Sequence, residues 1–175
     1  MKITAREALN RYKSGKSLEN VDIRGEDLSD NILKEVNLTA AKMSNTNFSN
    51  CDLSNSKINS MHSDMTGANL SNTNLSNTNF TFCCLVNANL SNANLSNTNL
   101  ASADFTCANL ENANLKNANL KNANLLKANL KNANLTHANL ESAYLRDSNI
   151  TKKQLNSANN FNKSTLPNGS KVNLT

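Results

Sequence analysis

The chain has 175 residues and fits one domain of ordinary size, with no tryptophan, few aromatic residues and a large number of asparagines. Its 18 basic residues outnumber 13 acidic ones, but the excess is local: residues 61–150 carry five groups of each sign, whereas residues 151–175 carry four lysines and no acid. The central part of the chain is therefore nearly neutral, which excludes a basic stripe of the kind that binds nucleic-acid phosphates.

A short helix is predicted at the start of the chain. Thr4 followed three residues later by Glu7 is a capping box, and Gly15 is a plausible stop. The apolar face between them consists of Ala5, Ala8, Leu9 and Tyr12. We therefore expect a helix over residues 5–14, within an N-terminal helical cap of residues 1–20. A helix with a binding role of its own is the alternative.

A period of five residues begins at Ile23 and continues to Ile150. A large apolar residue stands at every fifth position, and a small residue usually lies two positions before it, as Ala108 does before Leu110. Five fits neither the helical nor the strand period, so the chain must turn a corner once per repeat, with both residues pointing inward. Four sides close a square, so one coil takes about twenty residues, and stacked coils form a solenoid with a filled core.

The repeated motif Ala-Asn-Leu-x-x resembles that of the pentapeptide-repeat family. The resemblance covers about Val21 to Ile150 and implies an all-β fold, a right-handed quadrilateral β-helix. We expect about six to seven coils over residues 21–150, with short α-helical caps at both ends.

Two irregularities interrupt the period. Glu26 and Asn31 occupy inward slots, which predicts a frayed first coil whose polar side chains reach solvent or the cap. The large apolar residue after Ile58 comes seven positions later, so two residues are inserted within residues 59–63, around Met61 and His62. We expect a tolerated surface bulge there, and a binding protrusion is the alternative.

The repeats end at Thr151, where Thr151 and Gln154 form a second capping box. A helix is predicted near residues 152–159, in a C-terminal helical cap and tail of residues 151–175, similar to the ends of many bacterial pentapeptide-repeat proteins. Phe161 and Leu166 are expected to fold back onto the last coil, and a loose tail to follow Gly169. A homodimer through this end is a further hypothesis.

The sequence lacks the combinations of residues that form enzyme active sites. His62 and His137 are isolated, and no phosphate-binding loop rich in glycine is present. Cys51 and Cys83 fall in small inward slots, and the outward Cys84 and Cys107 lie in different columns and layers. We therefore expect no catalytic residue, no metal site and no cofactor. In the absence of a long apolar run or a signal peptide, we expect a cytoplasmic protein with reduced cysteines and no membrane contact.

Residues twenty apart should stack, which pairs opposite charges on the outer surface. The predicted pairs are Glu111 with Lys131, Lys121 with Glu141, and Lys127 with Asp147. Such exposed pairs stabilise a protein by at most about 1 kcal/mol each.

One side of the predicted rod is less polar than the others. We call it the Leu125 side, because Leu85, Phe105, Leu125 and Leu145 form its inward residues. Its outward and corner positions include Phe82, Cys84, Val86, Cys107, Leu126, Tyr144 and Arg146. Exposed apolar groups with an aromatic residue and an arginine are typical of an interaction surface, although sequence drift would also produce them.

These observations favour a non-enzymatic protein-binding or scaffold protein that holds an unidentified protein partner on the Leu125 side. One alternative is a DNA-mimicking protein that binds gyrase or another topoisomerase, as the quinolone-resistance branch of the family does. The resemblance implies an acidic rod for that role, and the balanced charges and basic end disfavour it. A secreted bacterial effector is another alternative. Direct nucleic-acid binding is not expected.

Overall fold

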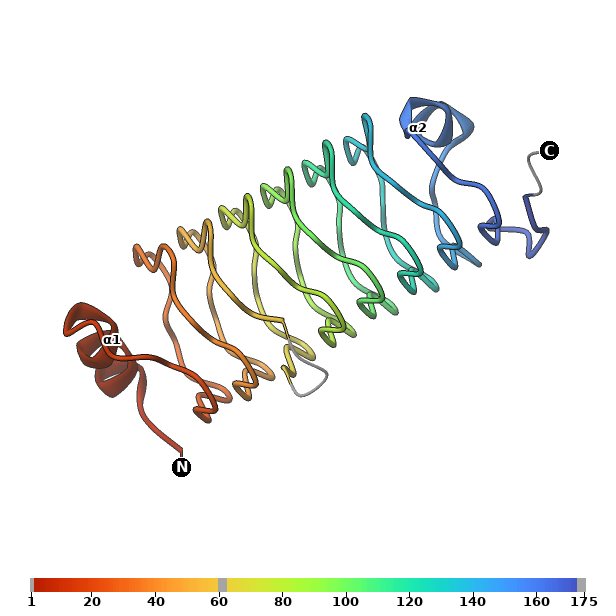
Figure 1. Cartoon of the computed structure of the whole chain (residues 1–175). Helices are drawn as coiled ribbons and strands as arrows, with labels where there is room; N and C mark the ends of the chain where they lie inside the picture. Colours follow the sequence, from red (N-terminus) through yellow and green to blue (C-terminus); the bar gives the residue numbers. More distant parts are fainter. Residues whose placement is uncertain (1, 60–62, 173–175) are drawn as a thin grey trace.

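The computed structural model describes residues 2–59 and 63–172 and shows a rod of stacked coils with the two chain ends at opposite ends of the rod (Figure 1). The rod is a right-handed quadrilateral β-helix, as predicted. Two short helices lie at its ends, α1 (Ala5–Lys13) and α2 (Lys152–Ser157). Among the described residues, neither helix is long and apolar enough to cross a membrane.

Successive coils pair through single parallel β-bridges between residues twenty apart, such as Asn89 with Asn109 and Asn109 with Asn129. One ladder runs the length of the rod through Lys2, Asp22, Lys42, Asp64, Cys84, Asp104, Asn124, Tyr144 and Thr165. This ladder extends beyond residues 21–150 by one level at each end. The two extra levels belong to incomplete coils at the ends of the rod, in which α1 and α2 take the place of some of the sides.

The corner of each repeat is made by the residue two positions after the large core residue. In the described repeats this residue has a left-handed backbone, with φ between 56° and 62° where it is not glycine, and it is asparagine in about half of them, as at Asn112 and Asn132. Asparagine tolerates this conformation better than most residues. Corner side chains also bond between coils, since the amide nitrogen of Asn132 donates to Asn112 at 3.2 Å.

A second set of asparagines lies one position before most of the core residues. The Asn129 amide nitrogen donates to Asn109 Oδ1 at 2.9 Å, and the same oxygen accepts the backbone N–H of Glu111 at 3.1 Å. Each side chain therefore closes a local turn and bonds to the next coil. These two roles explain the asparagine-rich composition.

The core is a filled column of large apolar side chains. Leu110 stacks between Leu90 and Leu130, and all three are fully buried. Threonines in the small inward slots are satisfied by backbone carbonyls; Thr73 Oγ1, for example, donates to the carbonyl of Phe48 at 2.7 Å. No buried side-chain nitrogen or oxygen of the described residues lacks a partner.

The N-terminal end is closed by α1, which takes the place of two sides of the first coil. Ile3 precedes the helix and Leu18 follows it, and both are buried beneath later core residues. Thr4 caps the helix through Oγ1, which accepts the N–H of Glu7 at 3.2 Å. The carboxylate of Glu26 accepts the N–H of Ala5 at 2.8 Å, so of the two predicted outcomes, solvent or the cap, Glu26 reaches the cap.

The reciprocal half of the predicted N-terminal capping box is not formed in the described chain. The Glu7 carboxylate is bonded instead to Arg11 at 2.8 Å, one helical turn further on. Glu26 instead places a carboxylate at the N-terminus of α1. Its negative charge stabilises the helix because it lies at the positive end of the helix dipole.

The two-residue insertion is confirmed by the spacing of the bridges. Lys42 pairs with Asp64, and Lys57 with Asn79, at intervals of 22 residues, after which the interval returns to 20. The residues predicted to form the bulge or protrusion, Met61 and His62, lie outside the described residues.

The C-terminal end is closed first by α2, whose capping box is complete. Gln154 Oε1 accepts the N–H of Thr151 at 2.9 Å. Its Nε2 donates to the carbonyls of Leu130 and Ala133 at 2.7 and 2.9 Å. One side chain thus ties the helix to two carbonyls of the preceding coil.

After α2 the chain resumes the rod and then turns back on itself. Asn160 bridges Asn139, and Thr165 bridges Tyr144, both in parallel. Thr165 then pairs with Lys171 in the antiparallel sense. The expected loose tail after Gly169 is therefore wrong as far as residue 172. Gly169, with φ of 84°, makes the turn that reverses the chain.

A comparison of two leucines tests which residues face inward. Leu110→Ala should lower the free energy of unfolding by about 2–5 kcal/mol, because it leaves a cavity in the core. Leu126→Ala removes the same atoms from a half-buried outward position and should cost less than about 1 kcal/mol. Chemical denaturation of both variants measures the difference, and equal losses would contradict the inward assignment of Leu110.

A second comparison tests the C-terminal closure. Gln154→Glu replaces the donor that faces two carbonyls with a third acceptor and should cost about 1–3 kcal/mol of unfolding free energy. Asn156→Asp makes the same chemical change at an exposed position of α2 and serves as the control. If both variants melt at the same temperature, Gln154 does not hold the helix to the coil.

Candidate protein-binding surface

The Leu125 side presents two outward rows along the rod. The first row, one position before each core residue, contains Asp64, Cys84, Asp104, Asn124, Tyr144 and Thr165. The second row, one position after, contains Thr66, Val86, Thr106, Leu126, Arg146 and Pro167. Phe82 and Cys107 stand on the two corners that flank these rows, both with left-handed backbones. All seven predicted residues therefore lie on this side or its edges.

The structure separates six of these seven residues into two groups. Phe82, Cys84 and Val86 lie at one level toward the N-terminal half. The Phe82 side chain is exposed, and Cys84 Sγ lies 3.2 Å from Thr66 Oγ1. Val86 is half-buried. We call Phe82, Cys84 and Val86 the lower group. It has one exposed aromatic ring and two partly covered smaller side chains.

Leu126, Tyr144 and Arg146 form the upper group, toward the C-terminal end. Tyr144 is 37% exposed, whereas Leu126 is half-buried. Arg146 stacks above Leu126, and its side chain is 58% exposed. Its Nε atom lies 3.9 Å from an Asp147 carboxylate oxygen, a contact long enough to leave the guanidinium open to another partner.

A band of polar groups divides the upper group from the lower. Asp104 Oδ1 accepts the backbone N–H of Thr106 at 2.9 Å and its hydroxyl at 2.6 Å. Asn124 Nδ2 donates to the same hydroxyl oxygen at 2.9 Å. Cys107 lies on the corner at this level and is exposed. The predicted strip is therefore not a continuous apolar surface.

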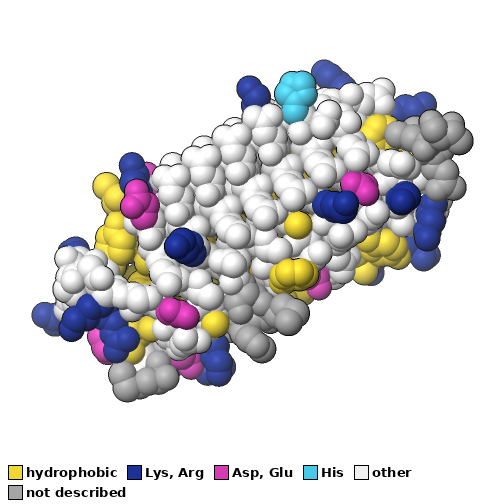
Figure 2. Space-filling model, viewed as in Figure 1, with side chains coloured by type: hydrophobic (Ala, Val, Ile, Leu, Met, Phe, Trp, Pro, Cys, Tyr) yellow, Lys and Arg dark blue, Asp and Glu magenta, His cyan; other side chains and the backbone are white. Residues whose placement is uncertain are grey.

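Exposed large hydrophobic side chains are few among the described residues. They are Ile32, Phe82 and Tyr144, so two of the three belong to the Leu125 side. In Figure 2, backbone and uncharged polar side chains, drawn in white, cover most of the visible face, and hydrophobic side chains stand as separate groups among them.

Ile32, which is 70% exposed, was missed from the sequence. A signal was present, because it occupies a position that is asparagine, aspartate or lysine in nearly every other repeat.

Basic side chains around the upper group were also missed. Lys127 and Lys163 lie on the two flanking corners, and Lys171 pairs with Thr165 above Tyr144. All three lysines are exposed, and none has a carboxylate within 4 Å in the described chain. The tail lysines were visible in the sequence, but their placement required the C-terminal hairpin.

Two of the three predicted charge pairs are formed. Lys131 Nζ lies 2.9 Å from Glu111, and Lys121 Nζ lies 3.1 Å from Glu141. The prediction of a Lys127–Asp147 pair is wrong, since Asp147 contacts Arg146 instead. The formed pairs join residues directly after core residues, whereas Lys127 and Asp147 project from a corner and the aspartate is one methylene shorter than glutamate.

Cysteine and histidine side chains do not assemble into a reactive site within the described residues. Cys51 and Cys83 are buried, and burial raises the pKa of both thiols, which opposes formation of a thiolate. His137 stands alone on an exposed corner, and His62 lies outside the described residues. No group of three potential metal ligands occurs in residues 2–59 or 63–172.

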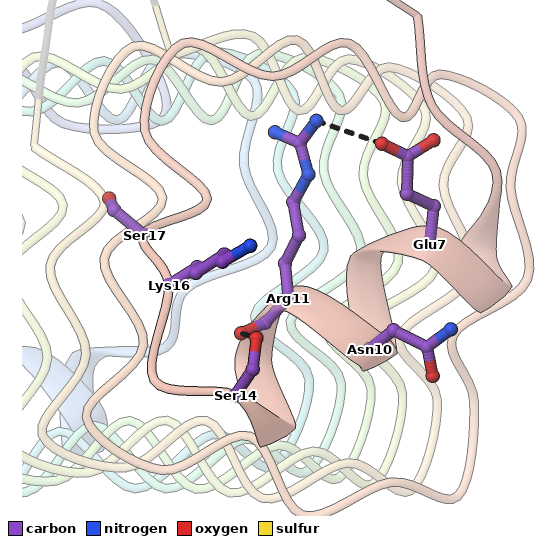
Figure 3. Close-up of a pocket in the computed structure, with 6 residues that line it drawn as sticks. All are labelled: Glu7, Asn10, Arg11, Ser14, Lys16 and Ser17. Atoms are coloured by element: carbon purple, nitrogen blue, oxygen red, sulfur yellow. Dashed lines mark hydrogen bonds and ion pairs between the residues drawn. The ribbon is translucent and has the colours of Figure 1, made fainter.

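One hollow lies at the N-terminal end, between α1 and the segment that follows it (Figure 3). It is lined by Glu7, Asn10, Arg11, Ser14, Lys16 and Ser17. The Arg11 guanidinium is engaged by Glu7, and Ser14 Oγ donates to the carbonyl of Arg11 at 2.9 Å. These six residues include no paired nucleophile and base, so the hollow is a consequence of how the helix closes the coil.

Comparison with known proteins supports the fold. A family model of pentapeptide repeats matches eight copies, over residues 32–61, 61–92, 83–122 and 113–151. No curated protein sequence matches the chain.

Three solved structures are among those to which the chain is similar. Trypsin-treated QnrB1, described as a plasmid-mediated fluoroquinolone resistance protein, is 17% identical, with a TM-score of 0.46 over 95% of this chain and 89% of that one. HetL from Nostoc sp. strain PCC 7120, described as involved in heterocyst differentiation regulation, is 21% identical, with a TM-score of 0.24 over 97% and 99%. Rfr23 from Cyanothece 51142 is 29% identical, with a TM-score of 0.39 over 79% and 92%.

The ion pair between coils makes a pH-dependent prediction. The hydrogen bond and charge of Lys131 hold the pKa of Glu111 below its ordinary value of 4.5. The pair therefore stabilises the fold above that value, and the effect is lost as the pH falls through the lowered pKa. In Lys131→Met, the pKa of Glu111 measured by carbon NMR should rise, whereas Lys116→Met should leave it unchanged. An unchanged pKa in Lys131→Met would contradict the pairing.

Proposed function

The chain belongs to the pentapeptide-repeat family, and we propose that it is a non-enzymatic protein-binding or scaffold protein that holds a protein partner on the Leu125 side. The observation that carries this proposal is the exposure of Phe82 and Tyr144. They are two of only three large hydrophobic side chains that the described residues expose, and both lie on one side of the rod. Aromatic groups exposed on an otherwise polar surface favour a protein interface.

The backbone at Phe82 supports the same conclusion. Phe82 occupies a corner with φ of 62°, where about half of the described repeats have asparagine. A bulky residue is strained in this conformation. Its exposed ring contributes little to the core in return, so selection for contact with a partner explains it better than selection for stability.

The closed interior also directs binding to the outer surface. Large apolar side chains fill the axis of every described coil, from Ile23 to Leu145, with exposures of at most 1%. A ligand therefore has to bind outside, on the sides or at the ends. Tyrosine and arginine are enriched among the residues that dominate interface energies, and Tyr144 and Arg146 provide both in the upper group.

Charge bears on the topoisomerase alternative. A protein that mimics a DNA backbone needs a surface with net negative charge. Residues 121–172 carry eight basic and two acidic groups, and Glu111 and Glu141 are paired with lysines. This distribution supports an ordinary protein partner over DNA mimicry. Protection of gyrase supercoiling against a quinolone at stoichiometric protein would reverse that preference.

Partner capture tests the proposal directly. Leu126→Asn combined with Tyr144→Ser should leave the melting temperature within about 3 °C, because neither side chain supports the core. Capture of specific partners from a lysate of the source cells should fall sharply.

Lys116→Asn combined with Thr136→Ser, on another side of the rod, is the matched control and should retain every partner. Equal retention of the same partners by both double variants would refute binding on the Leu125 side.

A further inference from the structure

The positive charge of the molecule is concentrated in the last third of the rod. Residues 121–172 contain eight lysines and arginines against two acidic residues, whereas residues 1–120 contain ten against eleven. Glu141 is already paired with Lys121, and Lys131 is paired with Glu111 from the coil below. In Figure 2, basic side chains crowd the C-terminal end, with few acidic ones among them.

Part of this charge surrounds the upper group of the Leu125 side. Tyr144 bridges Thr165, which bridges Lys171, so a lysine closes the row above the tyrosine. Arg146 stands above Leu126 in the neighbouring row, and Lys127 and Lys163 occupy the corners on either side. An exposed aromatic ring and a half-buried leucine are thus framed by four basic groups.

We propose that this basic apolar patch, composed of Leu126, Lys127, Tyr144, Arg146, Lys163 and Lys171, binds an acidic segment of a partner protein. An apolar or aromatic residue of the segment would contact Leu126 and Tyr144. Its carboxylates would pair with Arg146 and the surrounding lysines. This inference rests on the proposed function and specifies the chemistry of the partner.

The unpaired state of the basic groups supports the proposal. Lys127, Lys163 and Lys171 form no ion pair in the described chain, and the contact of Arg146 with Asp147 is long. Elsewhere on the rod, Lys121 and Lys131 are neutralised by glutamates of neighbouring coils. The patch therefore gathers three lysines without an ion pair and a weakly engaged arginine in one place, and such a charge accelerates and orients the approach of an acidic partner.

The apolar component favours an acidic protein segment over other polyanions. Nonspecific single-stranded nucleic-acid binding relies on aromatic rings that stack successive bases, and duplex binding relies on many phosphate contacts. Among the described residues, the patch offers one exposed ring and four basic groups. A peptide with one anchoring side chain between carboxylates matches this number and arrangement.

Fluorescence anisotropy with a labelled peptide tests the proposal on the full chain. The probe has one central phenylalanine with four glutamates on each side, and a second probe replaces the phenylalanine with glutamate. We expect the first probe to bind more tightly. Lys127→Glu combined with Lys171→Glu should weaken its binding by at least about tenfold.

Lys57→Glu combined with Lys116→Glu is the control for charge. It changes the net charge equally on other sides of the rod, and it should weaken binding by less than about twofold at physiological salt, where distant charges are screened. Equal effects of the two double variants would overturn the proposal, since net charge alone would then explain the binding.

Two further ligands distinguish an acidic protein segment from other anionic surfaces. A short DNA duplex and phosphatidylcholine vesicles containing phosphatidylserine should each bind more weakly than the phenylalanine probe at physiological salt. Tighter binding of either would overturn the proposal in favour of a phosphate surface. Equal affinity for the two peptide probes would overturn the role of Leu126 and Tyr144.

Partner capture separates failure of this inference from failure of the proposed function. Lys127→Glu with Lys171→Glu should abolish capture of the partners that Leu126→Asn with Tyr144→Ser abolishes. If only Leu126→Asn with Tyr144→Ser abolishes capture, the Leu125 side binds a partner that is not acidic. The proposal of an acidic segment is then wrong, and the proposed function stands. If neither pair affects capture, both fall.

Discussion

Hydrogen bonds between successive coils, repeated at intervals of twenty residues, are the interaction on which the rest of the rod depends. Each side of a coil pairs with the same side of the next coil through a single bridge, as Asn89 does with Asn109. A strand this short must turn at both ends, and a left-handed residue such as Asn112 makes each turn. Asparagine is abundant because it tolerates that backbone and because its amide repeats the backbone pairing between coils.

The same pairing creates unpaired edges at the two ends of the rod, and each end is closed differently. At the N-terminal end, α1 covers the core and the carboxylate of Glu26 caps its first turn. At the C-terminal end, Gln154 bonds two carbonyls of the preceding coil, and an antiparallel hairpin then covers part of the last one. Edges closed in these ways offer little template for pairing with other chains.

The sequence predicted what the period determines and missed what depends on single long-range contacts. The inward position of Leu110 and the insertion before Met65 follow from counting residues, because each coil repeats the geometry of the last. The capping by Glu26 joins residues 21 apart, and no local pattern distinguishes it from solvent exposure. The position of Lys171 depended on a reversal at Gly169, which was read as a loose end. The seven predicted site residues do share one side, but their division by Asp104 and Thr106 required the hydrogen bonds of the structure.

Because successive coils are stacked in a fixed register, the outward side chains stand in regular rows and columns. Each of them can change without disturbing the core. That freedom makes drift a plausible source of any one unusual side chain. Drift does not explain why Tyr144 and Leu126, Arg146 and three unpaired lysines meet at one end of one side. Unpaired like charges held close together also repel one another and therefore oppose folding slightly. A partner that supplies carboxylates relieves this repulsion, which links the stability of the C-terminal end to its recognition.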